Sequence, residues 1–243
     1  MTGSPDQDGG LAAADVSVED RFRRVRQRMV AACLAADRDI SEVRLLPVSK
    51  TKPSVAILAL HRMGVKRFGE NRIQEAQVKA EELAAEDVEW AIVGHLQTNK
   101  ARHMLSFASE FQALDSLRIA AELDKRLHAA GRQLDVLVQV NSSGEPQKYG
   151  FAPDEVMRVR KQLAAFDALN IRGLMTLAVF SDDKEKVGRC FEVTRALQAT
   201  LQDADGGGWE ELSMGMSGDF ELAIEHGSTC VRVGEAIFGP RAG

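Results

Sequence analysis

The sequence predicts a single (β/α)8 barrel of the TIM type, preceded by one extra helix. Short apolar runs alternate with helical segments about eight times from Val43 to the end of the chain. Most connections are only a few residues long, and several of the apolar runs lack polar alternation, as expected of parallel strands covered on both faces. Such units in a chain of 243 residues favour a closed barrel, with an open doubly wound sheet as the alternative.

The N-terminal part of the chain divides into a tail and a helix. Residues 1–15 are rich in Gly, Asp and Ala, so we expect a disordered tail, followed by one barrel domain over residues 16–243. A helix is predicted from Val16 or Ser17 to about Ala36, with Ser17 as its N-cap. Its apolar face comprises Phe22, Val25, Met29, Ala32 and Cys33. The arginines between these positions are expected to be solvated.

The predicted strands of the barrel are short and mostly apolar. They cover residues 43–49, 65–68, 88–93, 111–113, 136–140, 171–176, 211–214 and 231–233. The helices expected between them include residues 53–63, 72–84, 116–130, 153–166 and 184–203. The glycine-rich run at residues 203–208 reads as a loop that is too short to link a second domain.

Lys50 stands at the end of the first predicted strand, where a barrel carries its chemistry. The apolar run ends at this lysine, and Pro53 marks the start of the next helix. The loops at the carboxyl ends of barrel strands form the active face. Burial there lowers the pKa of a lysine from about 10.4 and favours Schiff-base chemistry. A solvated lysine at the start of a loop is the alternative.

The ends of the seventh and eighth strands are rich in small residues. Residues 215–219 and 234–235 have the composition of a barrel phosphate site, in which backbone N–H groups reach the anion. The eighth strand neighbours the first in a closed barrel, so this site would lie beside Lys50. Two interpretations follow: pyridoxal 5′-phosphate (PLP) as a cofactor, or aldol chemistry on a phosphorylated sugar or keto acid.

Other candidate residues are less informative. The chain has no GxxxxGK[ST] loop, and Gly215-x-x-Gly218 lacks the remaining glycine of a dinucleotide fingerprint. Single histidines such as His95 and His226 more often satisfy hydrogen bonds than act as catalysts. The methionines near the strand ends are expected to line the core or the pocket; they are Met175, Met214 and Met216.

The composition excludes several classes of function. A formal net charge of −5 and a pI of about 5.6 argue against a general binder of nucleic acids or membrane surfaces, since both need a basic surface. The three cysteines are far apart and form no CxxC pair, which fits a reducing cytoplasm better than a disulfide scaffold or zinc site. No apolar run approaches the roughly 20 residues that span a bilayer. We expect a cytoplasmic monomer without a bound metal and without nucleic-acid or membrane partners.

Several segments, in the same order, resemble the pyridoxal phosphate homeostasis proteins, single-domain relatives of the barrel domain of alanine racemase. They are residues 48–53 (VSKTKP), 68–71 (FGEN), 94–100 (GHLQTNK), 174–175 (LM), 212–217 (LSMGMS), 231–234 (VRVG) and 238–239 (FG). The resemblance implies a fold type III PLP-binding barrel that holds the cofactor as a Schiff base on Lys50. Such a protein would buffer PLP or transfer it to apo enzymes in vitamin B6 homeostasis, without catalytic residues. A racemase or a Schiff-base aldolase is the alternative.

The same resemblance implies a set of cofactor-binding residues. They are Lys50, Asn71, Met216, Ser217, Arg232, Gly234 and Glu235. Arg232 would face the pyridine nitrogen, and because a guanidinium stays protonated, the ring would be a poor electron sink. Relatives commonly carry Thr or Ser in place of Glu235, so this residue is expected to contribute only its N–H to the phosphate. Lys148 is expected to be a secondary contact with the ring oxygen.

Overall fold

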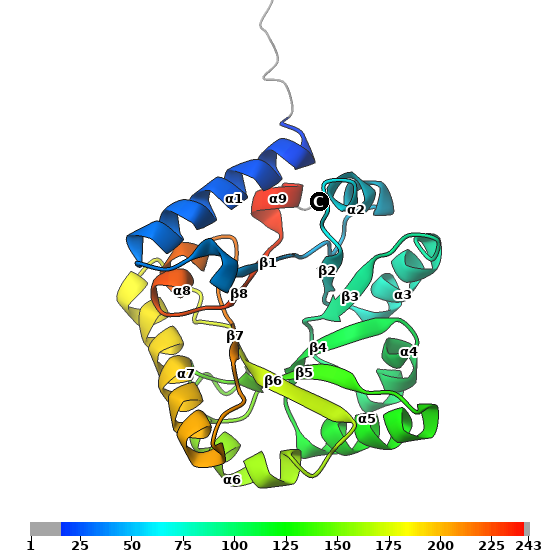
Figure 1. Cartoon of the computed structure of the whole chain (residues 1–243), viewed down its shortest axis with the longest axis vertical. Helices are drawn as coiled ribbons and strands as arrows, with labels where there is room; N and C mark the ends of the chain where they lie inside the picture. The colour runs from blue at the N-terminus through cyan, green and yellow to red at the C-terminus, as the bar shows by residue number, and fades with distance from the viewer. Residues whose placement is uncertain (1–15, 241–243) are drawn as a thin grey trace, which may run out of the picture.

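Residues 16–240 are described by a computed structural model, and they form the predicted barrel (Figure 1). An eight-stranded parallel sheet runs in the order β1-β8-β7-β6-β5-β4-β3-β2. Its strands are β1 (Arg44–Pro47), β2 (Arg67–Glu70), β3 (Glu89–Ile92), β4 (Ala108–Leu114), β5 (Leu134–Val140), β6 (Leu169–Thr176), β7 (Glu211–Ser213) and β8 (Cys230–Val233). A parallel bridge between Val48 and Gly69 closes the ring between β1 and β2. The tail predicted at residues 1–15 lies outside the described residues.

Helices surround the sheet and cover its outer face (Figure 1). They are α1 (Val18–Ala35), α2 (Ser54–His61), α3 (Ile73–Glu82), α4 (Ala101–Leu105), α5 (Leu117–Ala130), α6 (Pro153–Leu163), α7 (Lys184–Asp205), α8 (Phe220–Glu225) and α9 (Glu235–Phe238). Two 3-10 turns, η1 (Ile40–Glu42) and η2 (Thr98–Lys100), precede β1 and α4. Among the described helices, none combines the length and apolar character that crossing a membrane requires.

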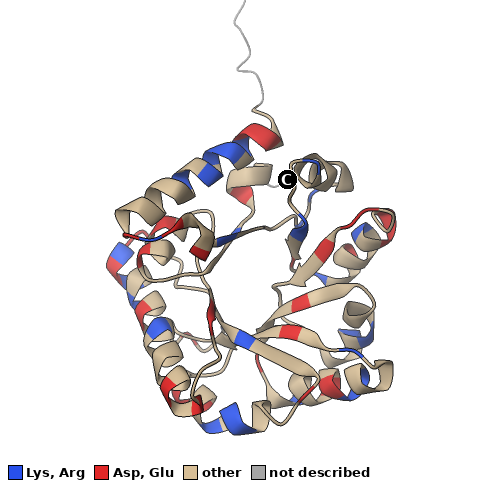
Figure 2. Cartoon of the chain, viewed as in Figure 1, with Lys and Arg blue, Asp and Glu red and all other residues tan. Residues whose placement is uncertain are grey.

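The extra helix α1 begins where the sequence predicts. The Ser17 side chain caps it by accepting a hydrogen bond of 3.1 Å from the Asp20 N–H. Its buried face packs over α8 and α9 (Figure 1). Most of its arginines are exposed, and Figure 2 shows basic positions along this helix. Arg28 differs, because its guanidinium pairs with Glu221 and covers the ring of Phe220 at 4.6 Å.

The observed elements differ from the predicted ones mainly at their ends. β2 starts at Arg67 rather than residue 65 and continues to Glu70, whose carbonyl accepts a 2.8 Å hydrogen bond from Val93. β4 is longer than predicted, because it pairs with β3 and β5 on its two sides. The helices α4, α8 and α9 are absent from the sequence prediction, since runs of five, six and four residues are too short to show a helical repeat.

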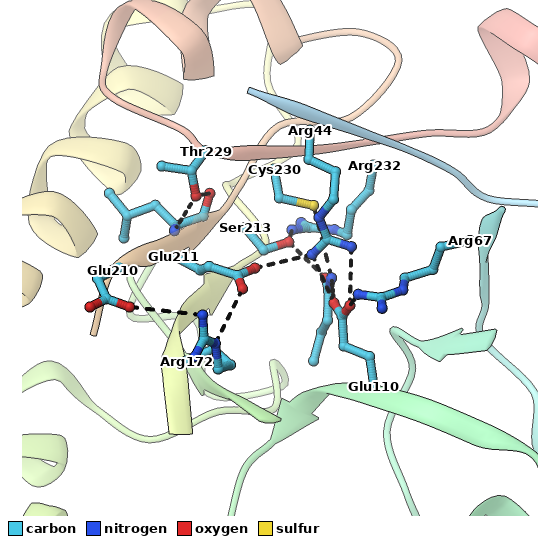
Figure 3. A network of polar contacts seen from close by, with 12 residues as sticks. Arg44, Arg67, Glu110, Arg172, Glu210, Glu211, Ser213, Thr229, Cys230 and Arg232 are labelled. Carbon is cyan, nitrogen blue, oxygen red and sulfur yellow. Dashed lines mark hydrogen bonds and ion pairs between the residues drawn. The ribbon is translucent and has the colours of Figure 1, made fainter. Parts of the chain in front are cut away.

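The inside of the barrel is polar near the amino ends of its strands (Figure 3). Glu110 of β4 is 3% exposed and accepts hydrogen bonds from Arg44 of β1 and Arg67 of β2. Arg44 also pairs with Glu211 of β7 at 3.1 Å. Ion pairs therefore connect strands across the interior, which apolar layers fill in many barrels.

Candidate functional site

Lys50 lies just beyond the carboxyl end of β1, as predicted. β1 itself ends at Pro47, earlier than the predicted residue 49, and the chain then turns so that the Lys52 N–H donates to the Ser49 carbonyl at 3.0 Å. Pro53, the predicted first residue of the next helix, is the N-cap of α2, which begins one residue later at Ser54. Lys50 lines a cavity of about 610 Å³, well within the range of small-molecule sites, which is roughly 300–1,000 Å³.

Every cofactor-binding residue predicted from the sequence lines this one cavity. The set comprises Lys50, Asn71, Met216, Ser217, Arg232, Gly234 and Glu235. Lys148, expected as a secondary contact, also lines it. These residues come from β8 and from the loops that follow β1, β2, β5, β7 and β8. They meet at the carboxyl face because a barrel brings the ends of all its strands to one rim.

The charge of the cavity suits an anionic ligand. Four cationic side chains line it: Lys50, Lys52, Lys148 and Arg232. Glu235 is the single carboxylate among the described lining residues, and it is exposed, as the outward orientation predicted for it requires. A dianionic phosphate ester therefore fits this lining better than a cation would.

The loops after β7 and β8 contact each other at the cavity wall. The Ser217 hydroxyl accepts a hydrogen bond of 3.2 Å from the Ala236 N–H, which leaves its own proton for another acceptor. Gly215 has a φ of 93°, and a Cβ there would lie 2.5 Å from the Ala223 side chain, so only glycine fits. The close packing of this loop on α8 fixes Ser217 beside the loop after β8.

Asn71, which also lines the cavity, is held by a second close approach between loops. A Cβ on Gly94, in the loop after β3, would lie 2.2 Å from the Asn71 carbonyl oxygen. Glycine at position 94 therefore lets the loops after β2 and β3 pack against each other.

Arg232 forms the buried floor of the cavity. The residue is 4% exposed, and burial lowers the pKa of its guanidinium below its ordinary range. Its Nη1 donates to Ser213 Oγ at 2.5 Å, and its Nη2 donates to the Thr176 carbonyl at 2.7 Å. Both acceptors are neutral, so the positive charge is not cancelled by a directly bound carboxylate in the described contacts.

A column of hydrogen bonds continues from Arg232 down through the barrel. Ser213 Oγ donates to Gln112 Oε1 at 2.7 Å, and the Gln112 amide donates to the Glu110 carboxylate. All donors in this column point from Arg232 toward Glu110, which accepts from Arg44 and Arg67 at the far end (Figure 3). The sequence prediction missed this column because its members are distant along the chain.

The histidines have the ordinary roles that the sequence favours. His95 Nδ1 lies 2.6 Å from Asp115 Oδ2, and its ring stacks on Tyr149 with centroids 3.8 Å apart. His95 is not among the cavity-lining residues. His226 is the C-cap of α8, and its Nδ1 lies 3.8 Å from Glu192. Of the three methionines considered, Met175 and Met214 are core residues and Met216 lines the cavity.

The sequence prediction missed the contribution of the loop after β6. Leu177, Ala178 and Phe180 line the cavity, and the Phe180 side chain is fully exposed. The apolar residues that follow Thr176 were a signal, because exposed aromatic residues on barrel loops often mark a ligand site. Lys52 also lines the cavity although it is not in the predicted cofactor-binding set, and its Nζ donates to the Pro240 carbonyl at 2.6 Å.

One cluster of potential metal ligands lies elsewhere in the described part of the chain. Asp124, His128 and Asp167 place their ligand atoms within 4.8 Å of one another. The His128 imidazole bonds the Asp124 carbonyl, and this contact together with the two carboxylates raises its pKa. These mutual contacts account for the cluster, and the expectation that no metal binds stays a prediction.

The chain matches the family described as alanine racemase, N-terminal domain, over residues 24–242. This match, together with the eight-stranded barrel and the lysine after β1, places the chain in the class of alanine racemase-type barrels.

Relatives narrow this class further. The pyridoxal phosphate homeostasis protein of Aquifex aeolicus (strain VF5) is 37% identical over 222 residues, covering 91% of this chain and 97% of that protein. Its counterpart in Pseudomonas aeruginosa is 37% identical over 225 residues, covering 93% and 96%. PipY of Synechococcus elongatus PCC7942, solved with PLP bound, is 33% identical with a TM-score of 0.78, covering 88% of this chain and 100% of that one. This chain belongs to the pyridoxal phosphate homeostasis protein family.

Proposed function

We propose that this protein binds PLP, holds it through Lys50 and releases it to apo enzymes in the cytoplasm, as a carrier rather than an enzyme. One observation carries the proposal: a single cavity joins Lys50 to the Ser217 loop and to Arg232. When bound, the cofactor supplies an aldehyde that condenses with the Lys50 amine to a Schiff base, with loss of water. The names of the relatives support the homeostatic role.

Each side of the cavity has a separate task in this proposal. The Ser217 hydroxyl and the backbone N–H groups of Gly234 and Glu235 bind the phosphate. Arg232 faces the pyridine nitrogen as a donor, because Ser213 and Thr176 already hold its guanidinium in place. Asn71 and Met216 contact the ring from opposite loops.

The cavity is open enough for exchange of its ligand. Met216 and Phe180 line it and are both exposed, so the ligand would remain in contact with solvent. An enzyme that stabilises reactive intermediates usually excludes water, whereas a carrier needs a reversible and accessible linkage.

Replacing Ser217 with alanine is expected to weaken the binding of PLP about ten- to a hundredfold. The variant loses one hydrogen bond to a charged acceptor, which contributes roughly 1.5–3 kcal/mol. Pyridoxal, which lacks the phosphate, should bind almost as tightly as to the wild-type protein. Fluorescence titration with both ligands measures the two affinities, and an equal loss for both would show that Ser217 acts through the fold.

The PLP-bound protein is expected to show no appreciable racemase, transaminase or decarboxylase activity. Arg232 keeps the ring a weak electron sink, and the described lining contains neither a tyrosine nor a histidine that could act as a second base. Incubation with L-amino acids in deuterated water, followed by NMR, measures exchange of the α-hydrogen. Exchange that is fast and depends on Lys50 would make the protein an enzyme of the racemase or aldolase type instead.

Transfer is tested separately from catalysis. The loaded protein is mixed with an apo PLP enzyme, and recovery of that enzyme's activity is followed against an equal amount of free PLP. Faster recovery than with free PLP supports the carrier role, and recovery that is no faster leaves only a storage role.

A further inference from the structure

Both peptide groups that flank Lys50 are bound by side chains of one helix, α3. The Ser49 carbonyl, on the N-terminal side of Lys50, accepts a hydrogen bond of 2.8 Å from Lys79 Nζ. The Thr51 N–H, on its C-terminal side, donates to Glu75 Oε1 at 2.5 Å. Lys79 and Glu75 are one helical turn apart and lie 2.7 Å from each other. The backbone around Lys50 is therefore held at two points by one ion pair.

A buried carboxylate completes this cluster, which we call the α3 clamp: Ser49, Glu70, Glu75 and Lys79. Lys79 Nζ lies 2.6 Å from Glu70 Oε1, which also accepts a 2.7 Å bond from the Ser49 hydroxyl. An ammonium group has three N–H donors, and Lys79 directs them at Ser49, Glu70 and Glu75. Lys79 is 5% exposed and Glu70 is fully buried, so these bonds are shielded from water.

The α3 clamp lies behind the reactive lysine and not in the cavity. No member of the clamp is among the residues that line the cavity, whereas Lys50 and Thr51 both are. Lys79 comes from α3 on the outer side of the sheet, so it reaches the β1 end from outside the barrel. Its role toward a ligand would be indirect, through the backbone of Lys50.

The backbone at this point needs such support. Thr51 has a φ of 64°, in the left-handed region that is unfavourable for a β-branched residue. Without the Glu75 acceptor, the peptide between Lys50 and Thr51 could rotate toward an unstrained conformation. That rotation would change the direction in which the Lys50 side chain leaves the backbone.

We propose that Lys79 and Glu75 are positioning residues that direct the Lys50 amine toward the aldehyde of the bound cofactor. The inference rests on the proposed function, because it assigns these residues to the linkage with PLP. It predicts that the clamp contributes to binding of an aldehyde ligand but not to binding of the same ring and phosphate without the aldehyde.

Pyridoxine 5′-phosphate provides that comparison, because it has an alcohol where PLP has the aldehyde. Glu75→Ala removes the acceptor of the Thr51 N–H at a side chain that is 25% exposed, so the variant is expected to fold. Its affinity for PLP should fall about tenfold, as for one lost hydrogen bond to a charged group, with pyridoxine 5′-phosphate within twofold of wild type. Glu75→Gln keeps an acceptor oxygen and should recover most of the loss.

Two further variants separate positioning from general destabilisation. Lys79→Met should show the same selective loss of PLP affinity, while Lys66→Met, which breaks an exposed pair with Asp87, should leave both ligands unaffected. In a Lys50→Ala background, Glu75→Ala should have no further effect on either ligand, because the two residues act on one step.

Equal losses for both ligands, or a Glu75→Gln variant no better than Glu75→Ala, would overturn the positioning role. A failure of the proposed function looks different, because the wild-type protein would then bind neither ligand, or would bind both without forming a linkage that borohydride can reduce.

Discussion

Replacing Lys50 with alanine is expected to abolish the covalent attachment of PLP. Lys50 is the first cavity-lining lysine after β1, and β8, whose loop is proposed to bind the phosphate, pairs with β1. Borohydride reduction of the wild-type protein with PLP should fix the cofactor to one peptide, which mass spectrometry identifies. The wild-type protein should also be yellow, and the variant colourless.

Lys52 and Lys148 are the matched controls, because both line the same cavity. Lys52→Ala and Lys148→Ala should retain the reduced adduct on Lys50. An adduct on either of these lysines in the wild-type protein would contradict the assignment, since the strand end would then not deliver the reactive amine.

The sequence predicted the barrel and the residues at its strand ends, because both follow from the order of strands and helices along the chain. Strands with no polar alternation predict a closed parallel sheet, and that sheet makes Lys50, Asn71, Ser217 and Arg232 neighbours without knowledge of any side-chain contact. The predicted residues line one cavity because each of them lies at or just after the carboxyl end of a strand.

Contacts between side chains from separate strands could not be predicted in the same way. Lys79 looks like one more lysine on an amphipathic helix, and only its burial against Ser49 and Glu70 reveals its role. Glu110 and Gln112 occupy a strand that the sequence predicts as three residues long, so their inward orientation has no signal in the chain. Tertiary packing, rather than local pattern, decides these positions.

The polar column links the candidate site to the stability of the barrel. Arg232 is held through Ser213 and Gln112, and Gln112 in turn depends on Glu110. Glu110 receives two arginines because Arg44 and Arg67 begin neighbouring strands at the point where the ring closes. A substitution at Glu110 should therefore reduce the stability of the barrel more than it changes ligand binding in the cavity.

Replacing Glu110 with alanine is expected to lower the free energy of unfolding by about 3 kcal/mol at pH 7. The change leaves Arg44 and Arg67 without their shared carboxylate in the barrel interior, a loss that costs about 3–5 kcal/mol for a buried pair. The lower end applies because both arginine side chains are 31% exposed and keep Glu211 and Glu89 as partners. Urea unfolding of the two proteins measures the difference.

The effect of Glu110 should also depend on pH. Burial alone would raise the pKa of its carboxyl, but the guanidinium groups of Arg44 and Arg67 outweigh burial and hold the pKa below the ordinary value of 4.5. A lowered pKa in the folded state stabilises the protein above the unfolded pKa, and this contribution is lost as the pH falls through the folded value. The difference between wild type and Glu110→Ala should therefore be constant near pH 7 and shrink below about pH 4.5. Asp87→Ala, which breaks an exposed pair with Lys66, should change the free energy of unfolding much less, because solvent screens that pair. A Glu110→Ala loss as small as this control, or one that does not change with pH, would show that solvent already compensates the two arginines.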